Sequence, residues 1–388
     1  MKSKLLAISL LIIFILRAEA KNNGPIIWNL NHIENIRANP DLSTVRKQIL
    51  YNATRYAKMK PLSVMDKKKV FNSDKHYYQS LAIYFWPDST SKNGKYKQRD
   101  GIYNPEYKDY DYVNLCSVLY RLEYISTAYY ISGDNEYYKA FVNQLNAWFI
   151  DKDTYMLPNF EYSQVTPGSN NNQGRSEGLI DAYCFNGILD AIRLVSLRKS
   201  LPPYTRKGLK EWFVSFEDWL TTSHKGKRAY KFVGNHAVNY DLLRYNIATF
   251  VGDKKVCKQI YEEFPNMRLL DEIDSLGRQP KELNRTRSFF YQIYNLTHII
   301  DICLLMKANR QFLYKENADL INKVGYYLLS YKGNHIKYPY KELGPWEKLF
   351  KSLDIQLYRI NRLAGRKLFN VDEQRITSGS NLESYLNS

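Results

Sequence analysis

Large apolar side chains recur at three- and four-residue spacing along most of the chain, whereas alternating apolar and polar positions are scarce. The first pattern is typical of amphipathic helices and the second of strands. Pro202-Pro203 and Gly252-Asp253 interrupt the helical pattern, as helix boundaries do. The pattern therefore predicts an all-α protein, with helices over residues 112–132, 135–150, 177–198, 204–222, 236–251, 254–265, 283–308, 315–331 and 344–364.

Short loops join these predicted helices into hairpins. Repeated helical hairpins close into a ring or stack into a solenoid, and the chain has no strict sequence period. We therefore expect a single-domain (α/α) toroid or barrel over residues 21–365. A polar C-terminal tail over residues 366–388 follows, which is either loosely ordered or docks its end as a short helix. Two long loops, 59–111 and 151–176, interrupt the helices, and loops of that length in a compact domain are usually functional.

The first twenty residues have the layout of a secretory signal. The stretch "MKSKLLAISLLIIFILRAEA" begins with Lys2 and Lys4, continues with an apolar run over 5–16, and ends in small residues. Its apolar part is too short to span a membrane, and no later stretch is both long and apolar enough. We therefore expect residues 1–20 to be a signal peptide, and the protein to be periplasmic or secreted without stable membrane insertion.

The chain is strongly basic, with a formal net charge of +17. Removal of residues 1–20 takes away three positive charges and one negative charge, which leaves +15. Such a surplus favours polyanionic partners, and an exported protein more often meets an acidic polysaccharide than a nucleic acid. No recognisable nucleic-acid-binding module is present, so we expect an acidic polysaccharide as partner. The sequence does not predict the oligomeric state.

The four cysteines, Cys116, Cys184, Cys257 and Cys303, contain no C-x-x-C pair, which argues against zinc and redox sites. Cys116 and Cys303 lie in apolar helical patterns, where buried free thiols are expected, although one disulfide among the four stays open. No clustered metal-ligand motif is present, so we predict neither a metal nor another cofactor. The 34 tyrosines suit helix packing and stacking against sugar rings equally.

Unusual polar and aromatic residues concentrate in a few stretches. These are "HYYQSLAIYFWPDSTSKNGKYKQRDGIYNPE" (76–106), "NFEYSQ" (159–164), "NNQGRSEGLID" (171–181), "GNHAVNYD" (234–241) and "QPKELNRTRSFFYQIYNL" (279–296). In this order they resemble the alginate lyase superfamily, which includes polysaccharide lyase families 5 and 38. The resemblance covers residues 70 to 350. It implies an (α/α) toroid and β-elimination on uronic-acid polysaccharides.

The chain departs from the family pattern at three places. The doubled asparagine of the family is Gly234-Asn235 here, Ala237 follows the histidine where glycine is common, and the opening H-D-Y motif is "HYY" (76–78). The resemblance gives a functional role to the second asparagine of the doublet, which is retained. We expect the change at Gly234 to alter helix capping or the adjoining subsite.

β-Elimination removes the C5 proton beside a carboxylate and expels the glycosidic oxygen on C4. The enzyme must therefore neutralise that carboxylate, and Asn235, His236 and Arg285 are suitable residue types. The resemblance selects Arg285 over Arg287 for this role. It also implies that Tyr291 is the base and then the acid, if nearby cations favour its phenolate. His236 is the better base for a substrate with the opposite C5 configuration.

Seven further residues are candidates for substrate binding. Several have equally plausible structural roles. Arg175 can brace a helix start, and Arg99 can pair with Asp100 or Glu106. Tyr84 and Trp86 can pack the lid of the barrel. Tyr294 is the main rival of Tyr291, and we expect His298 to be a core residue. The candidates are Arg175, Gln173, Tyr84, Trp86, Arg99, Tyr240 and Arg287.

We therefore expect a polysaccharide lyase that cleaves alginate (polymannuronate) or glucuronan by metal-independent β-elimination. Two other functions stay open. A glycoside hydrolase would need two opposed carboxylates, and Glu177 and Asp181 lie one helical turn apart on a single helix, which is a poor arrangement for that role. A non-catalytic protein that binds acidic polysaccharides would need only the charge and the aromatic residues.

Overall fold

The structure is a computed structural model that describes residues 24–91 and 94–372, with Ile376, Leu382 and Leu386. It is 64% helical and 4% strand, which confirms the all-α prediction. The helices are α2 (Leu30–Ala38), α3 (Ser43–Ala57), α4 (Asp111–Ser132), α5 (Asn135–Phe149), α6 (Cys184–Ser196), α7 (Pro203–Thr222), α8 (His224–Tyr230), α9 (Asn235–Val251), α10 (Lys254–Phe264), α11 (Leu270–Glu272), α12 (Pro280–Leu283), α13 (Ser288–Ala308), α14 (Leu313–Glu316), α15 (Ala318–Leu329) and α16 (Trp346–Ala364).

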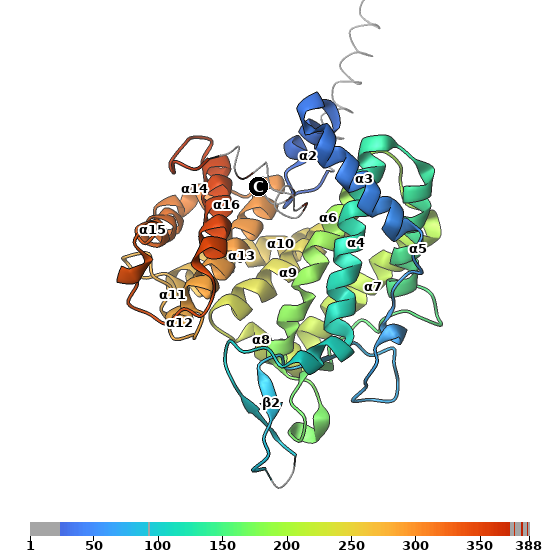
Figure 1. The fold of residues 1–388 in the computed structure, drawn as a ribbon, viewed down its shortest axis with the longest axis horizontal. Helices are drawn as coiled ribbons and strands as arrows, with labels where there is room; N and C mark the ends of the chain where they lie inside the picture. The colour runs from blue at the N-terminus through green and yellow to red at the C-terminus, as the bar shows by residue number, and fades with distance from the viewer. Residues whose placement is uncertain (1–23, 92–93, 373–375, 377–381, 383–385, 387–388) are drawn as a thin grey trace, which may run out of the picture.

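The helices form an (α/α) toroid of helical hairpins. Helices α4, α6, α9 and α13 pack side by side in that order, and α16 packs on α13. The partner helices α3, α5, α7 and α10 cover this row. Figure 1 shows the same progression, from α3–α5 on one side, through α7–α10, to α13–α16 on the other.

The helix boundaries differ from the predicted ones in three ways. Helices α2, α3 and α8 were absent from the predicted set. The segment 177–198 begins as a 3-10 helix, Ser176–Tyr183, before α6 starts. The predicted helix 283–308 is wrong at its start, because α12 ends at Leu283 and α13 begins at Ser288. The four residues between them form a turn that carries Arg285.

In the described part of the C-terminal tail, apolar residues are buried in the core, which agrees with the expectation that the end of the tail docks and not with a loosely ordered tail. Phe369 and Val371 are buried, as are Ile376, Leu382 and Leu386. The backbone N–H of Asn29 donates to the carbonyl of Leu386 at 2.6 Å, which ties the tail to the start of α2. The tail is apolar at these spaced positions even though its composition is polar. The predicted signal peptide, residues 1–20, lies outside the described residues.

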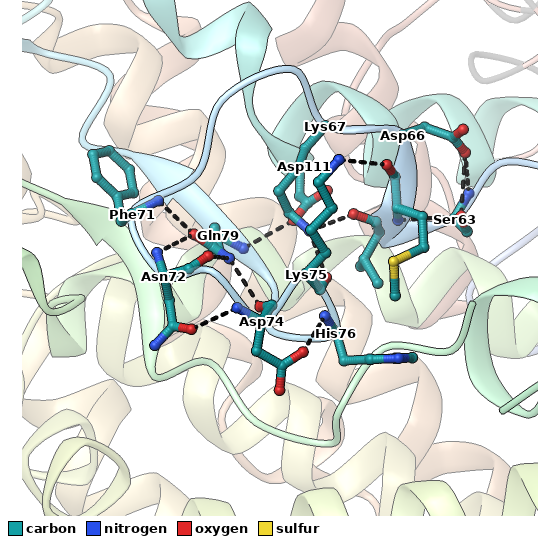
Figure 2. Close-up of polar contacts among 12 residues, drawn as sticks. Ser63, Asp66, Lys67, Phe71, Asn72, Asp74, Lys75, His76, Gln79 and Asp111 are labelled. Carbon is teal, nitrogen blue, oxygen red and sulfur yellow. Dashed lines mark hydrogen bonds and ion pairs between the residues drawn. The ribbon is translucent and has the colours of Figure 1, made fainter. Parts of the chain in front are cut away.

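The long loop 59–111 is anchored by a buried ion pair at the start of α4 (Figure 2). The ammonium of Lys67 lies 3.0 Å from a carboxylate oxygen of Asp111, and both side chains are fully buried. The other contact of this carboxylate oxygen is the backbone N–H of Gln79, which donates at 3.0 Å. The Gln79 side chain in turn accepts from the N–H groups of Phe71 and Asn72. These contacts fix the beginning of β1.

Four short strands lie in the two long loops. Strand β1 (Gln79–Leu81) pairs in parallel with β4 (Tyr162–Val165), so the loops 59–111 and 151–176 are joined. Strands β2 (Phe85–Pro87) and β3 (Tyr96–Gln98) form an antiparallel hairpin. Their ends carry conspicuous polar and aromatic side chains, including Tyr84 and Asp100. The loops therefore present a defined surface at one end of the toroid.

Two features of the core bear on the sequence predictions. Helix α13 is long and apolar enough to cross a membrane, but 78% of its most apolar window is buried inside the protein, as in a core helix. All four cysteines are free thiols. Cys303 is buried as expected, whereas Cys116 is only half-buried and its sulfur lies 3.7 Å from that of Cys184.

Candidate active site

A pocket of about 280 Å³ gathers residues from every motif stretch singled out in the sequence. Segments that are distant in the chain meet here: the loop before β2, the 3-10 helix Ser176–Tyr183, the start of α9, the turn before α13 and α13 itself. Six of the eleven predicted site residues line the pocket, namely Tyr84, Arg175, Asn235, His236, Arg285 and Tyr291.

Tyr291 lies in the first turn of α13 with its ring under a guanidinium. The central carbon of Arg285 is 3.8 Å from the ring centroid, and the hydroxyl lies 2.8 Å from that of Tyr84. Burial raises the pKa of Tyr291, although Arg285 and the Tyr84 hydroxyl oppose this effect. The phenol is therefore protonated in the free protein. This outcome differs from the expectation that surrounding cations favour the phenolate, because desolvation outweighs one nearby charge.

Arg285 is held by the loop that follows β3. Its Nη2 atom donates to a carboxylate oxygen of Asp100 at 2.7 Å, and the Thr286 N–H and hydroxyl donate to the same carboxylate. Burial raises the pKa of Asp100, but these hydrogen bonds outweigh burial and lower it. Asp100 therefore stays ionised and orients Arg285. Within the part of the chain that the structure describes, the Nη1 atom of Arg285 has no hydrogen-bond partner.

Asn235 is fixed by a buried carboxylate. Its backbone N–H donates to Glu282 Oε1 at 2.7 Å, and its side-chain Nδ2 lies 3.0 and 2.9 Å from the two carboxylate oxygens. The preceding N–H, that of Gly234, donates to Glu272 at 2.5 Å. Burial raises the pKa of Glu282 and raises that of Glu272 to about 7. Both carboxyl groups thus satisfy N–H groups that the start of α9 leaves open.

The departure at Gly234 has a physical reason. Its backbone has φ 73° and ψ −161°, a region that only glycine adopts without strain. A Cβ atom at this position would lie 2.6 Å from Glu282 Oε1. A side chain here would displace the carboxylate that holds Asn235, so glycine and Glu282 fit together.

His236 lies in the pocket wall next to Asn235, with its ring 5.9 Å from that of Phe232. Burial lowers its pKa to about 4, and the positive charges of Arg285 and Arg175 act in the same direction, whereas Glu177 opposes them. The imidazole is therefore neutral near pH 7. It can accept a proton, but it does not contribute a positive charge to stabilise a phenolate on Tyr291.

The model of the alginate lyase family matches residues 63–337, which is more than half of the chain. The chain belongs to the alginate lyase family. A crystal structure of an alginate lyase from Bacteroides ovatus is similar to it, with a TM-score of 0.83 and 32% sequence identity over 88% of this chain and 92% of that chain. No curated protein matches the chain. The protein is therefore a polysaccharide lyase, and a polysaccharide is its substrate.

Two carboxylates of this lyase line the pocket, and both are engaged. Asp181 accepts hydrogen bonds from Tyr78, Ser80 and Gln164, and burial raises its pKa to about 6. Glu177 lies 3.4 Å from Nε of Arg175. Burial opposes its ionisation, but Arg175 outweighs burial and lowers the pKa of Glu177. Both residues belong to one 3-10 helix.

Five predicted substrate-binding residues do not line the pocket of the lyase. Arg99 stacks on Trp86 of the β2–β3 hairpin at 5.2 Å, and Arg287 lies over Phe290 at 4.5 Å. Gln173 is exposed in the loop before the 3-10 helix. A role in substrate binding stays a prediction for these four residues. The fifth residue outside the pocket is Tyr240.

The expectation that Tyr240 contacts substrate is not met. It lies four residues after His236 on α9, about 6 Å further along the helix axis. The side chain is buried, and its hydroxyl donates to the carbonyl of Leu220 on α7 at 3.0 Å. Tyr240 thus braces α9 against α7. His298 is fully buried, as expected of a core residue.

Several pocket residues were not among the predicted site residues. Gln164 is one, although it ends the motif stretch 159–164, and its φ of 47° is rare for a residue other than glycine. Most of the others also lie in the motif stretches, and Tyr294 is the rival of Tyr291, whereas Tyr112 lies outside the stretches. They include Phe85, Gln98, Tyr103, Tyr112 and Tyr294. Among the described residues, no group of three or more histidine, cysteine, aspartate or glutamate side chains is placed to hold a metal ion.

Proposed function

We propose that this lyase cleaves an acidic uronate polymer by metal-independent β-elimination, with alginate rich in mannuronate as the first candidate substrate and glucuronan as the second. The observation that carries the proposal is the single pocket that contains Asn235, His236, Arg285 and Tyr291. These groups supply what elimination needs. Asn235 and Arg285 can bind the carboxylate, and His236 and Tyr291 can transfer a proton.

In this mechanism the uronate carboxylate faces the Asn235 amide and the Nη1 atom of Arg285. Neutralising this charge makes the C5 proton more acidic and stabilises the enolate that forms. The base removes the C5 proton, the C4–C5 double bond forms, and the C4–O bond breaks. A proton passes to the departing oxygen. The products are a shortened chain and an unsaturated uronate at the new non-reducing end.

The proton carriers depend on the sugar. When the C5 hydrogen and the C4 oxygen share one face, as in mannuronate or glucuronate, Tyr291 serves both steps. It must then release its phenol proton to solvent as substrate binds, and the Arg285 guanidinium, whose central carbon lies 3.8 Å from the ring centroid, favours the phenolate. When the two groups lie on opposite faces, as in guluronate, neutral His236 takes the C5 proton and protonated Tyr291 donates to the leaving oxygen.

We further propose that the mature protein is exported, either to the periplasm or to the medium. The support is the basic, apolar and small-residue layout of residues 1–20. An uncleaved anchor is the alternative. Mass spectrometry of the N-terminus of the protein isolated from its own cells distinguishes the two, because processing removes residues 1–20.

The test is the ultraviolet absorbance of the unsaturated product, measured with purified mature protein on polymannuronate, polyguluronate, glucuronan and a glycosaminoglycan, with and without chelator. We expect a chelator-resistant rise on polymannuronate or glucuronan. Tyr291→Phe should lower kcat by about 10²- to 10⁴-fold, the usual contribution of a general acid–base group. Tyr294→Phe, which changes a neighbouring tyrosine of the same pocket, is the matched control and should retain activity.

Two outcomes would contradict the proposal. New reducing ends without the unsaturated product would indicate hydrolysis, and the carboxylates Glu177 and Asp181 would then be tested. Binding of the polymers without any cleavage would indicate a non-catalytic role, and Tyr291→Phe would then have no effect.

A further inference from the structure

A second cavity, of about 540 Å³, lies beside the catalytic pocket between the end of α3 and the first half of α4. Four tyrosines line it, Tyr56, Tyr107, Tyr112 and Tyr120, together with Arg121. We call it the tyrosine groove. Figure 1 shows α3 lying against α4, the helix that supplies most of the groove.

The tyrosine groove adjoins the catalytic pocket. Tyr112 lines both cavities, so they share a wall. A series of ring contacts also joins them: Tyr84 stacks on Tyr103 with centroids 5.4 Å apart, Tyr103 contacts Tyr107 at 6.1 Å, and Tyr107 contacts Tyr112 at 6.1 Å. Tyr84 is the residue whose hydroxyl lies 2.8 Å from that of Tyr291. The aromatic path thus begins at the reacting groups.

The rings of the groove are not all used for packing. Tyr124 is buried in the core and makes an edge-to-face contact with the Tyr56 ring, with centroids 5.8 Å apart. Tyr120, one turn earlier on α4, is 40% exposed, and Tyr103 on the connecting path is 46% exposed. A tyrosine that served packing alone would bury its face against a helix. Although Tyr103 stacks on Tyr84 and Tyr120 contacts the edges of Tyr56 and Tyr124, part of each of these two rings stays open to solvent.

The groove carries positive charge. Arg121 donates from Nη1 to the carbonyl of Lys60 at 3.0 Å, and it forms no ion pair with a carboxylate of the described residues. Arg55 lies over the Tyr56 ring at 4.9 Å, and Lys58 and Lys60 are exposed on the same segment. Aromatic faces that stack on the C–H face of a sugar, beside guanidinium groups that meet carboxylates, suit a uronate chain.

We propose that the tyrosine groove is a distal subsite that binds further uronate residues of the same polysaccharide chain whose cleavage occurs in the catalytic pocket. The inference rests on the proposed function for the identity of the sugar. It predicts that long chains bind better than short ones, because only a long chain reaches from Tyr291 to Tyr120.

The experiment compares Tyr120→Ala and Arg121→Gln with wild type on the cleaved polymer and on its shortest cleaved oligosaccharide. Loss of one aromatic contact should raise KM for the polymer about two- to tenfold, with kcat and the oligosaccharide kinetics unchanged. Tyr51→Ala is the matched control, because Tyr51 is 70% exposed on α3 but lies outside the groove. Circular dichroism and thermal unfolding establish that each variant folds.

A parallel binding measurement separates this inference from the proposed function. Polymer affinity is measured in the Tyr291→Phe background, with and without Tyr120→Ala. Weaker binding in the double variant supports the groove even if wild type cleaves none of the polymers. Equal KM changes on polymer and oligosaccharide, or equal affinity of the single and double variants, would overturn the groove while leaving any observed cleavage intact.

Discussion

The two walls of the catalytic pocket are built in different ways. The helix wall consists of Asn235 and His236 at the start of α9, and its anchor, Glu282, touches Asn235 directly. The loop wall consists of Tyr84 and the segment around Asp100. Part of this wall is held by residues that do not line the pocket. The ion pair of Lys67 and Asp111 fixes β1 (Figure 2). Tyr84 follows β1 in the chain.

This difference separates stability from catalysis. A change in the Lys67–Asp111 pair should unfold a loop and lower the stability of the whole protein. A change in Glu282 should disturb the Asn235 amide with little effect on folding. The predictions below test this division.

The largest effect is expected for Lys67→Met. It leaves the Asp111 carboxylate buried without its cation, and breaking a buried ion pair in this way costs about 3–5 kcal/mol in the free energy of unfolding. Denaturant or thermal unfolding measures the loss. A midpoint unchanged from wild type would show that the pair does not anchor the loop.

Two further variants serve as controls for Lys67→Met. Lys67→Met combined with Asp111→Leu removes both charges and should recover much of the lost stability. Lys139→Met breaks the exposed pair with Glu136 and should leave the unfolding midpoint unchanged.

The second prediction concerns Glu282→Gln, which keeps the volume but replaces one acceptor oxygen by a donor. Asn235 presents two donors to the carboxylate, and a hydrogen bond to a charged group contributes roughly 1.5–3 kcal/mol. If that energy orients the Asn235 amide, kcat/KM should fall about 10- to 100-fold. The unfolding midpoint should change much less than in Lys67→Met. A large loss of stability with normal kcat/KM would contradict a positioning role for Glu282.

The third prediction is the pH dependence that the helix wall imposes. The pKa of His236 is lowered to about 4, so the neutral imidazole is present above pH 4 and is lost as the pH falls through that value. On polyguluronate, where His236 is the base, kcat/KM reports the protonation of the free enzyme, so its acid limb should lie near pH 4 and not near the ordinary histidine value of about 6.5. Glu177 raises the pKa of His236, so Glu177→Gln should move the limb to lower pH. A limb near pH 6.5 would mean that the His236 imidazole is exposed to solvent, or that the reaction does not need its neutral form.

The sequence predicted the helix wall better than the loop wall. Asn235 and His236 are adjacent in one motif, so their position in the chain is enough to place them in the same region of the site. The pairing of Arg285 with Asp100 joins residues that are 185 positions apart, and it depends on a turn that the apolar periodicity of 283–308 conceals. The raised pKa of Tyr291 was also missed, because residue types indicate charges but not the depth of burial.

The burial of the C-terminal tail also could not be predicted from the apolar pattern of the sequence. Its composition is polar, yet Ile376, Leu382 and Leu386 are buried. Isolated apolar residues without a helical run give no periodic signal. Their burial depends on contacts with distant parts of the chain, such as the hydrogen bond from the Asn29 N–H to the Leu386 carbonyl.

The smallest effect is expected for Tyr84→Phe on the loop wall. The variant keeps the ring on Tyr103 but removes the hydroxyl whose hydrogen bond lowers the pKa of Tyr291. A neutral hydrogen bond contributes about 0.5–1.5 kcal/mol, so kcat/KM on polymannuronate should fall about two- to tenfold, because Tyr291 must ionise there. On polyguluronate Tyr291 acts only as an acid, so any activity on that polymer should be nearly unchanged. Equal losses on the two polymers would show that Tyr84 supports the wall without tuning the phenol, and the loop wall would then contribute only shape.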